Sequence, residues 1–197
     1  MDGYTLALPS GWRRIQVQDA GGDTVAAIVH EAFAEAPPEV PGESLGPLKA
    51  DLERRLTRMI AEARRSEVTH LYLPVEAVHG TVVAASFVVS EEPVPPGTAD
   101  PAVIIAELAA APGNASMVTI DGTAGVRTEQ ASGPDPSRGI AHGSRRVSYL
   151  LPFPGDTGRL LVMAFSTQAD GDPGDPYSKI LVELFDTIIS TFRWNPG

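Results

Sequence analysis

The chain has 197 residues, of which 43% are hydrophobic and 20% charged, with 19 glycines, 18 prolines and no cysteine. The hydrophobic fraction excludes wholesale disorder, and the lack of cysteine excludes disulfides and thiolate chemistry. The longest apolar runs, such as Leu160–Phe165, fall far short of the ~20 residues that span a bilayer. We expect a single globular domain over residues 1–197. Because Met1–Tyr4 begins no signal sequence, we expect a cytoplasmic location.

The formal charge of −10 argues against sequence-independent binding to nucleic acid, since a polyanion would be repelled. The basic residues are almost all arginine, with Lys49 and Lys179 as the two lysines. Together with abundant alanine, glycine and proline, this bias is typical of a bacterial protein from a high-GC genome.

The first third of the chain predicts a hairpin and a helix. Alternating residues over Tyr4–Leu8 and Trp12–Val17 flank the turn sequence Pro9-Ser10-Gly11, which predicts a β-hairpin. Apolar residues at helical spacing then predict a helix over Val25–Ala36. A loop rich in proline, glycine and glutamate is expected over Pro37–Pro47.

The clearest helix covers Leu48–Arg65, where apolar residues form one stripe and the arginines lie largely off it. The segment Lys49–Glu67 holds six basic and four acidic residues, so it is a basic patch on an acidic protein. Two interpretations stay open: a solvated face with intrahelical ion pairs such as Asp51–Arg55, or a docking surface for an acidic partner. The candidate docking residues are Arg54, Arg55 and Arg58.

The middle of the chain is rich in predicted strands. Leu71–Val75 and Thr81–Ser90 suggest a second hairpin, with its break near His79-Gly80. Asp100-Pro101 then supplies an N-cap and a first-turn proline for a short helix over Ala102–Ala111.

Two further hairpins follow. Asp121-Gly122 accepts the positive φ values of a tight turn, and it joins Met117–Ile120 to Thr123–Arg127. Arg145–Leu151 and Arg159–Ser166 form a longer hairpin.

A terminal helix is predicted over Tyr177–Phe192, where eight apolar residues make the broadest stripe in the chain. We expect Phe185 and Ile189 to lie against a sheet, and Asp186 to lie off the stripe, where its replacement would change stability little.

These elements amount to about eight strands, joined mostly by hairpins, and about four helices. Hairpins imply antiparallel pairing, so the fold class is α+β. The strands Val82–Val89 and Leu160–Phe165 are apolar or small throughout and need cover on both faces. The prediction is a three-layer α/β/α sandwich around a mainly antiparallel sheet.

Three segments carry a family resemblance: Leu6–Trp12, with its Pro-Ser-Gly-Trp end; Ile120–Arg127, with Asp-Gly-x-x-Gly; and the closing Phe185–Trp194. In these segments the chain resembles the PsbP-like family (PsbP/Mog type), as a distant member of actinobacterial type. The resemblance implies a PsbP-like fold and a binding or assembly role. Members share no common catalytic residues, so it implies no catalytic site.

The chain lacks the common cofactor and nucleophile motifs. Gly139–Gly143 has the outline of a nucleophile elbow, with His142 in place of serine. Asp170, Asp172 and Asp175 resemble the start of a calcium loop, but the twelfth position is Leu181 instead of glutamate. The four histidines, at positions 30, 70, 79 and 142, are dispersed. We therefore predict no catalytic, cofactor-binding or metal-binding residues.

Two sets of residues leave an enzymatic alternative open. The carboxylates of Glu76, Glu91, Glu92 and Glu129 are available for acid–base chemistry, although the sequence gives no distances between them. Aromatic residues on predicted strands form either core or a ligand pocket, with core favoured; they are Tyr72, Phe87, Tyr149 and Phe165.

We therefore favour a non-enzymatic binding or adaptor module of the PsbP-like type with a protein partner, no cofactor, no nucleic acid and no membrane span. The alternative is a small hydrolase or isomerase that uses scattered carboxylates and histidines. Exposed edges of an antiparallel sheet also lead us to expect a homodimer.

Overall fold

The computed structural model places the chain in two compact units, one made of Met1–Pro9 and Ala84–Gly197 and the other of Ser10–Val83. The single domain expected from the sequence stays a prediction. Within the described residues, no helix is long and apolar enough to cross a membrane. The structure describes residues 3–34, 42–76, 85–94, 97, 100–133, 144–156, 158–168 and 176–195.

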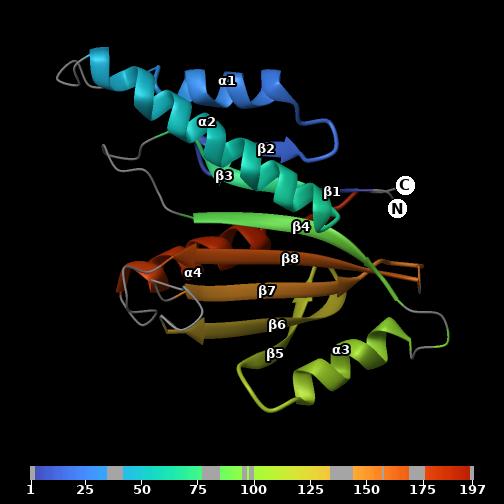
Figure 1. Cartoon of the computed structure of the whole chain (residues 1–197). Coiled ribbons are helices and arrows are strands. Elements are labelled where there is room, and N and C mark those ends of the chain that lie inside the picture. The colour runs from blue at the N-terminus through green and yellow to red at the C-terminus, as the bar shows by residue number, and fades with distance from the viewer. Residues whose placement is uncertain are drawn as a thin grey trace. The chain divides into compact units, whose positions relative to one another are not determined.

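The first unit is built on an antiparallel sheet whose strand order is β4-β8-β7-β6-β5 (Figure 1). The two hairpins predicted here, β5–β6 and β7–β8, are confirmed. Their bounds, with that of the neighbouring strand, are β4 Ala85–Pro93, β5 Ala115–Ile120, β6 Thr123–Ser132, β7 Ser144–Pro152 and β8 Arg159–Gln168.

The structure explains why glycine stands at both glycine positions of the Asp-Gly-x-x-Gly segment. Asp121 and Gly122 have φ values of 46° and 76°, as the tight β5–β6 turn requires. Gly125 lies on β6, where a Cβ atom would stand 2.5 Å from the carbonyl oxygen of Leu150. A larger residue at position 125 would therefore push β6 and β7 apart.

Helices cover both faces of this sheet. Helix α3 (Pro101–Ala110) packs its buried Ile105 against Val126 of β6 and Leu160 of β8. The neighbouring side chains along these strands point the opposite way, because side chains alternate along a strand. On that second face lies α4 (Pro176–Ser190), so the unit is a three-layer α/β/α sandwich, as predicted (Figure 1).

The centre of the α4 layer is Phe185, which is 1% exposed. Its ring centroid lies 5.0 Å from that of Phe165, 5.4 Å from Phe87 and 5.7 Å from Tyr149. Ile189, one turn later, is also 1% exposed. The expectation that these two residues of the terminal helix face the sheet is confirmed.

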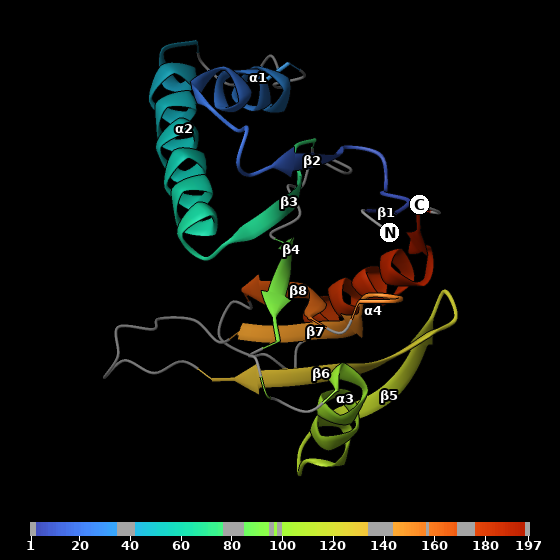
Figure 2. The same cartoon turned by 90° about the vertical axis from the view of Figure 1, so that its right-hand side faces the viewer.

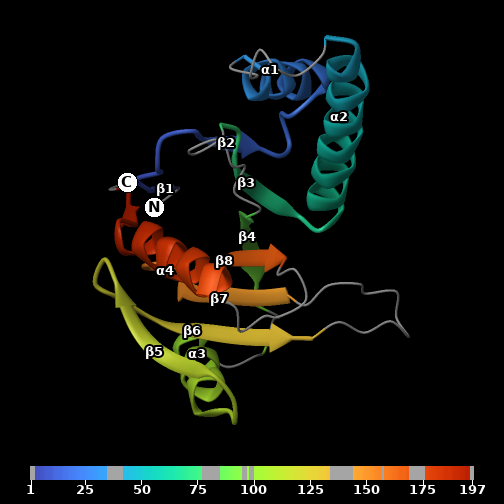
Figure 3. The ribbon, with the colours of Figure 1, turned by 90° about the vertical axis from the view of Figure 1, so that its left-hand side faces the viewer.

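The chain ends form a small second sheet in this unit, which corrects the first predicted hairpin. Strand β1 (Tyr4–Thr5) pairs antiparallel with β9 (Arg193–Trp194) at the end of α4 (Figure 3). Tyr4 stacks on Phe192 with ring centroids 5.4 Å apart. This non-local aromatic contact, together with the β1–β9 pairing, replaces the hairpin partner that we expected across Pro9-Ser10-Gly11.

The second unit holds β2 (Trp12–Gln16), α1 (Gly22–Ala32), α2 (Gly42–Arg65) and β3 (Val68–Pro74). Strands β2 and β3 pair antiparallel, α1 packs against α2, and α2 packs against β3 (Figure 2). The guanidinium group of Arg64 donates hydrogen bonds to the carbonyls of Val17 at 2.9 Å and Ala20 at 2.8 Å. The last turn of α2 thereby holds the chain between β2 and α1.

Both helices predicted in this unit are present, with different bounds. Helix α1 starts three residues before Val25 and stops at Ala32, and α2 starts at Gly42 and therefore includes the end of the predicted loop. The break of the second predicted hairpin falls in residues 77–84, outside the described residues.

We predict that Phe185→Ala lowers the free energy of unfolding by about 3–5 kcal/mol, since it leaves a cavity among three aromatic rings. Ile180 lies on the same helix but is 59% exposed, so Ile180→Ala should change stability by only about 0.5 kcal/mol. Denaturant unfolding of both variants tests this. Equal stability of the two would contradict the packing of α4 described above.

Candidate functional site

The predicted docking residues lie on the exposed surface of α2. Asp51 bonds both Arg54, at 3.1 Å, and Arg55, at 2.6 Å, so the intrahelical pair expected from the sequence is present. The Arg54 and Arg55 side chains are nonetheless 67% and 75% exposed. Pairs this exposed contribute little to stability, so these arginines are available to a partner.

Arg54 and Arg58 lie one turn apart on α2, and both line a shallow groove of about 570 Å³ on this helix. Arg55 does not line it. Among the residues that the structure describes, no carboxylate forms an ion pair with Arg58. The groove therefore holds one neutralised guanidinium, one unneutralised guanidinium and the carboxylate of Glu53 beside small side chains. Its lining residues are Ala50, Glu53, Arg54, Thr57, Arg58 and Ala61.

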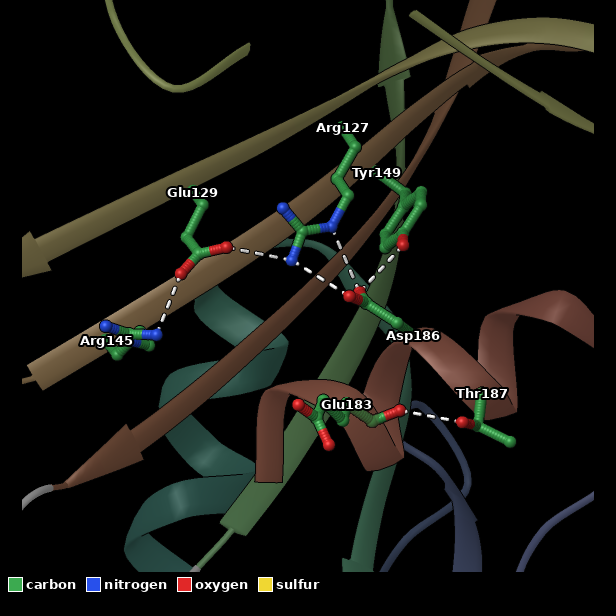
Figure 4. Close-up of polar contacts among 7 residues, drawn as sticks. All are labelled: Arg127, Glu129, Arg145, Tyr149, Glu183, Asp186 and Thr187. Atoms are coloured by element: carbon green, nitrogen blue, oxygen red, sulfur yellow. Dashed lines mark hydrogen bonds and ion pairs between the residues drawn. The ribbon is translucent and has the colours of Figure 1, made fainter. Parts of the chain in front are cut away.

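A second polar cluster lies between the sheet and α4 in the first unit (Figure 4). Arg127 on β6 bonds Asp186 on α4 with Nε at 3.1 Å and Nη2 at 3.0 Å. Arg127 also pairs with Glu129 at 2.9 Å, and Glu129 pairs with Arg145 at 3.0 Å. The Tyr149 hydroxyl donates to Asp186 at 2.7 Å.

The charges of this cluster balance, with two guanidinium groups against two carboxylates. Burial raises the pKa of Tyr149, and its hydrogen bond to Asp186 raises it further, so the phenol stays protonated near neutral pH. Burial opposes the charge of Arg127, but hydrogen bonds to Asp186 and Glu129 outweigh it and raise the pKa. The arrangement supports a structural clamp more than a reactive acid or base.

One end of the cluster is incompletely bonded. Arg145 Nε and Thr167 Oγ1 are buried and have no hydrogen-bond partner among the described residues. The two residues stand opposite each other in the β7–β8 register.

We did not predict this cluster from the sequence, nor the partners of Asp186. Asp186 does lie off the apolar stripe, but its carboxylate accepts hydrogen bonds from Arg127 and Tyr149. Its position off the stripe is confirmed, but the expectation that its replacement is neutral left these bonds out of account and stays a prediction. The available signal was weak: alternation places Arg127 and Glu129 on one face of β6, yet their partner lies about 60 residues away.

Two of the four histidines lie in the described part of the chain. His30 is exposed on α1, and His70 on β3 has its Nε2 2.7 Å from Nη2 of Arg14. Arginine can only donate, so Nε2 accepts and the imidazole is neutral. Burial, and then the charge of Arg14, lower the pKa of His70 to about 4.

The other candidates for metal or nucleophile chemistry fall outside the described residues: His79, Gly139–Gly143 and the aspartates 170, 172 and 175. In the described part of the chain, no three His, Asp or Glu side chains are grouped to hold a metal ion.

The four carboxylates considered for acid–base chemistry do not form a shared site. Glu91 pairs with Arg159 at 2.7 Å, and Glu92 accepts a hydrogen bond from Ser90 at 3.0 Å. Glu129 belongs to the cluster under α4, and strands β8 and β7 separate it from Glu91 in the sheet. Glu76 packs beside Gly11 in the second unit.

The aromatic residues on the strands are core residues, as favoured. Tyr72, Phe87 and Phe165 are 1% exposed and Tyr149 is 6% exposed.

No protein-family model matches the chain, and no curated protein sequence matches it. Among solved structures, LpqN of Mycobacterium tuberculosis, a protein involved in cell envelope biogenesis, is similar with a TM-score of 0.50 at 11% identity. That match covers 98% of this chain and 83% of LpqN. A protein from Bacteroides thetaiotaomicron VPI-5482 matches with a TM-score of 0.45 at 9% identity, over 98% of this chain and 46% of that one. The likeness to LpqN concerns the fold alone, and membership of the PsbP-like family stays a prediction.

We predict that His70 makes folding sensitive to acid. Its pKa is about 6.5 in the unfolded chain and about 4 in the folded one, so the unfolded chain takes up the proton first as the pH falls. The stability that neutral His70 provides is complete above pH 6.5 and is lost as the pH falls to about 4. Because the ring is half-buried and screened by solvent, we expect a loss of about 1–2 kcal/mol.

His70→Gln is the matched control, because its amide oxygen can accept from Arg14 but cannot titrate. Denaturant unfolding between pH 7 and pH 4 should show a steeper loss for the wild type than for His70→Gln. Parallel curves would show that His70 ionises normally in the folded protein.

Proposed function

We propose that the chain is a non-enzymatic binding or adaptor module of the PsbP-like type, and that an acidic segment of a protein partner docks on the groove of α2. The observation that carries the proposal is the pair of exposed arginines, Arg54 and Arg58, which lie one turn apart beside small residues in one groove.

The chemistry of the groove favours an acidic helical segment. Ala50, Thr57 and Ala61 follow one face of α2, and their small side chains let another backbone approach closely. Arg58 has no described carboxylate partner, so an incoming carboxylate would not have to displace one. In a chain of net charge −10, a local positive surface also steers an acidic partner to this helix.

The remaining polar groups support a binding role over catalysis. Under α4, Arg127 and Arg145 neutralise Asp186 and Glu129, and Glu91 is paired with Arg159. His70 is held neutral by its bond with Arg14. These groups each have a structural role, which weakens the alternative of a hydrolase or isomerase built from scattered carboxylates and histidines.

The fold similarity to LpqN suggests a process in which the partner could take part. LpqN is involved in cell envelope biogenesis, and we extend the proposal to an assembly role of this kind for the present chain. The cytoplasmic location expected from the sequence stays a prediction, so the compartment of the partner is part of what must be measured.

We predict that a photo-crosslinking amino acid at Thr57, at the centre of the groove, captures a discrete protein in cells that express the chain. Mass spectrometry should place the crosslink in a segment with more acidic than basic residues. The double variant Arg54→Glu/Arg58→Glu should reduce capture at least tenfold, because it reverses the charge of both arginines that line the groove beside the crosslinker.

The control is Arg146→Glu on β7, which makes one such charge reversal at an exposed arginine outside the groove. Capture should be unchanged in that variant. The proposal fails if Thr57 captures nothing, or if capture survives the double charge reversal.

A further inference from the structure

Strand β5 ends the sheet of the first unit, and among the described strands only β6 pairs with it (Figure 3). Edge strands usually carry lysine, proline or a bulge, which prevent a second strand from pairing. Ala115–Ile120 holds no charged residue and no proline, in a chain of which 20% of the residues are charged. Strand β5 itself therefore carries neither of the two sequence features, charge and proline, that most often protect an edge.

Exposed hydrophobic side chains gather near the same edge. Six large hydrophobic residues are exposed in the described part of the chain, and three of them lie on α3 or β5: Val103 at 43%, Leu108 at 36% and Met117 at 53%. Met117 stands opposite Val126 in the β5–β6 register, so it points to the face that α3 covers. A partner strand would form backbone hydrogen bonds with the free edge of β5 and would also bury part of the Met117 side chain.

The edge is also held in place before any partner arrives. The Trp194 backbone N–H donates to Asp121 at 2.9 Å, and its indole donates to Thr123 at 3.0 Å. These bonds tie the β5–β6 turn to the end of the chain. An ordered strand loses less conformational entropy on pairing than a flexible one.

We infer that β5 is a self-docking edge, on which a second copy of this chain adds its own β5 in antiparallel orientation. A two-fold axis through Met117 puts Met117 opposite itself, Ala115 opposite Thr119, and Ser116 opposite Val118. Each pair then points to one face, as antiparallel pairing requires. The pairing would join the two sheets into one and would bring the two Met117 side chains into contact.

The composition of β5 favours a second copy over an unrelated extended peptide. In a two-fold pairing every side chain of the strand faces one from the same strand, so a charged residue would come close to its own copy. A strand with no charge avoids this repulsion, even though each copy carries a net charge of −10. The inference is independent of the docking proposed for α2, because it uses a different unit of the chain.

A single-cysteine experiment tests the register directly, because the chain contains no cysteine. In Met117→Cys the two Cα atoms would stand about 4.5–5.5 Å apart, within disulfide range. In the control Thr119→Cys, an exposed position on the same face of the same strand, they would be about 13 Å apart. Under mild oxidation of the full chain, Met117→Cys should form a linked dimer at least tenfold faster than Thr119→Cys.

Light scattering supplies the second readout. The wild type should approach twice 20.8 kDa at high micromolar concentration, and Met117→Lys should shift it to 20.8 kDa while circular dichroism shows an intact fold. The inference is overturned if the two cysteine variants crosslink at equal rates. It is also overturned if the wild type stays at 20.8 kDa, or if a dimer persists in Met117→Lys.

Discussion

The packing of Phe185 against Phe87, Tyr149 and Phe165 is the contact on which the first unit depends. It seats α4 on the sheet, and the next residue, Asp186, can then reach Arg127 and Tyr149. The residues that follow α4 then contact other elements: Trp194 bonds the β5–β6 turn, and Phe192 stacks on Tyr4 near the start of the chain. Loss of the aromatic contact would therefore loosen the polar cluster and both chain ends together.

The polar groups between α4 and the sheet and those on the surface have different roles. Side chains that could do acid–base chemistry, such as Asp186 and Glu129, hold elements to one another. Two of the surfaces that the described residues leave open to solvent are the α2 groove with its arginines and the uncharged edge of β5. The two surfaces that we propose for partners thus lie in different units.

Local signals in the sequence predicted local structure well. The helix that ends at Arg65, the Asp121-Gly122 hairpin and the terminal helix depend on spacing and turn chemistry within a few residues. The first hairpin was wrong because Tyr4 finds its partner about 190 residues away, where Phe192 offers an aromatic ring. The cluster under α4 was missed for the same reason, since strand register and helix placement decide which charges meet. The arginines of α2 were found because one helix turn brings them together.

The polar cluster under α4 holds this helix to the sheet, and a double-mutant cycle on Arg127 and Asp186 tests this role most directly. Arg127→Met and Asp186→Leu should each destabilise the protein, because each leaves a partly buried charge unpaired. The double variant removes one charge of each sign and leaves Glu129 with Arg145. We expect the two changes to be non-additive by about 1–3 kcal/mol in denaturant unfolding. Additive effects, or single variants as stable as the wild type, would contradict this structural role of the cluster.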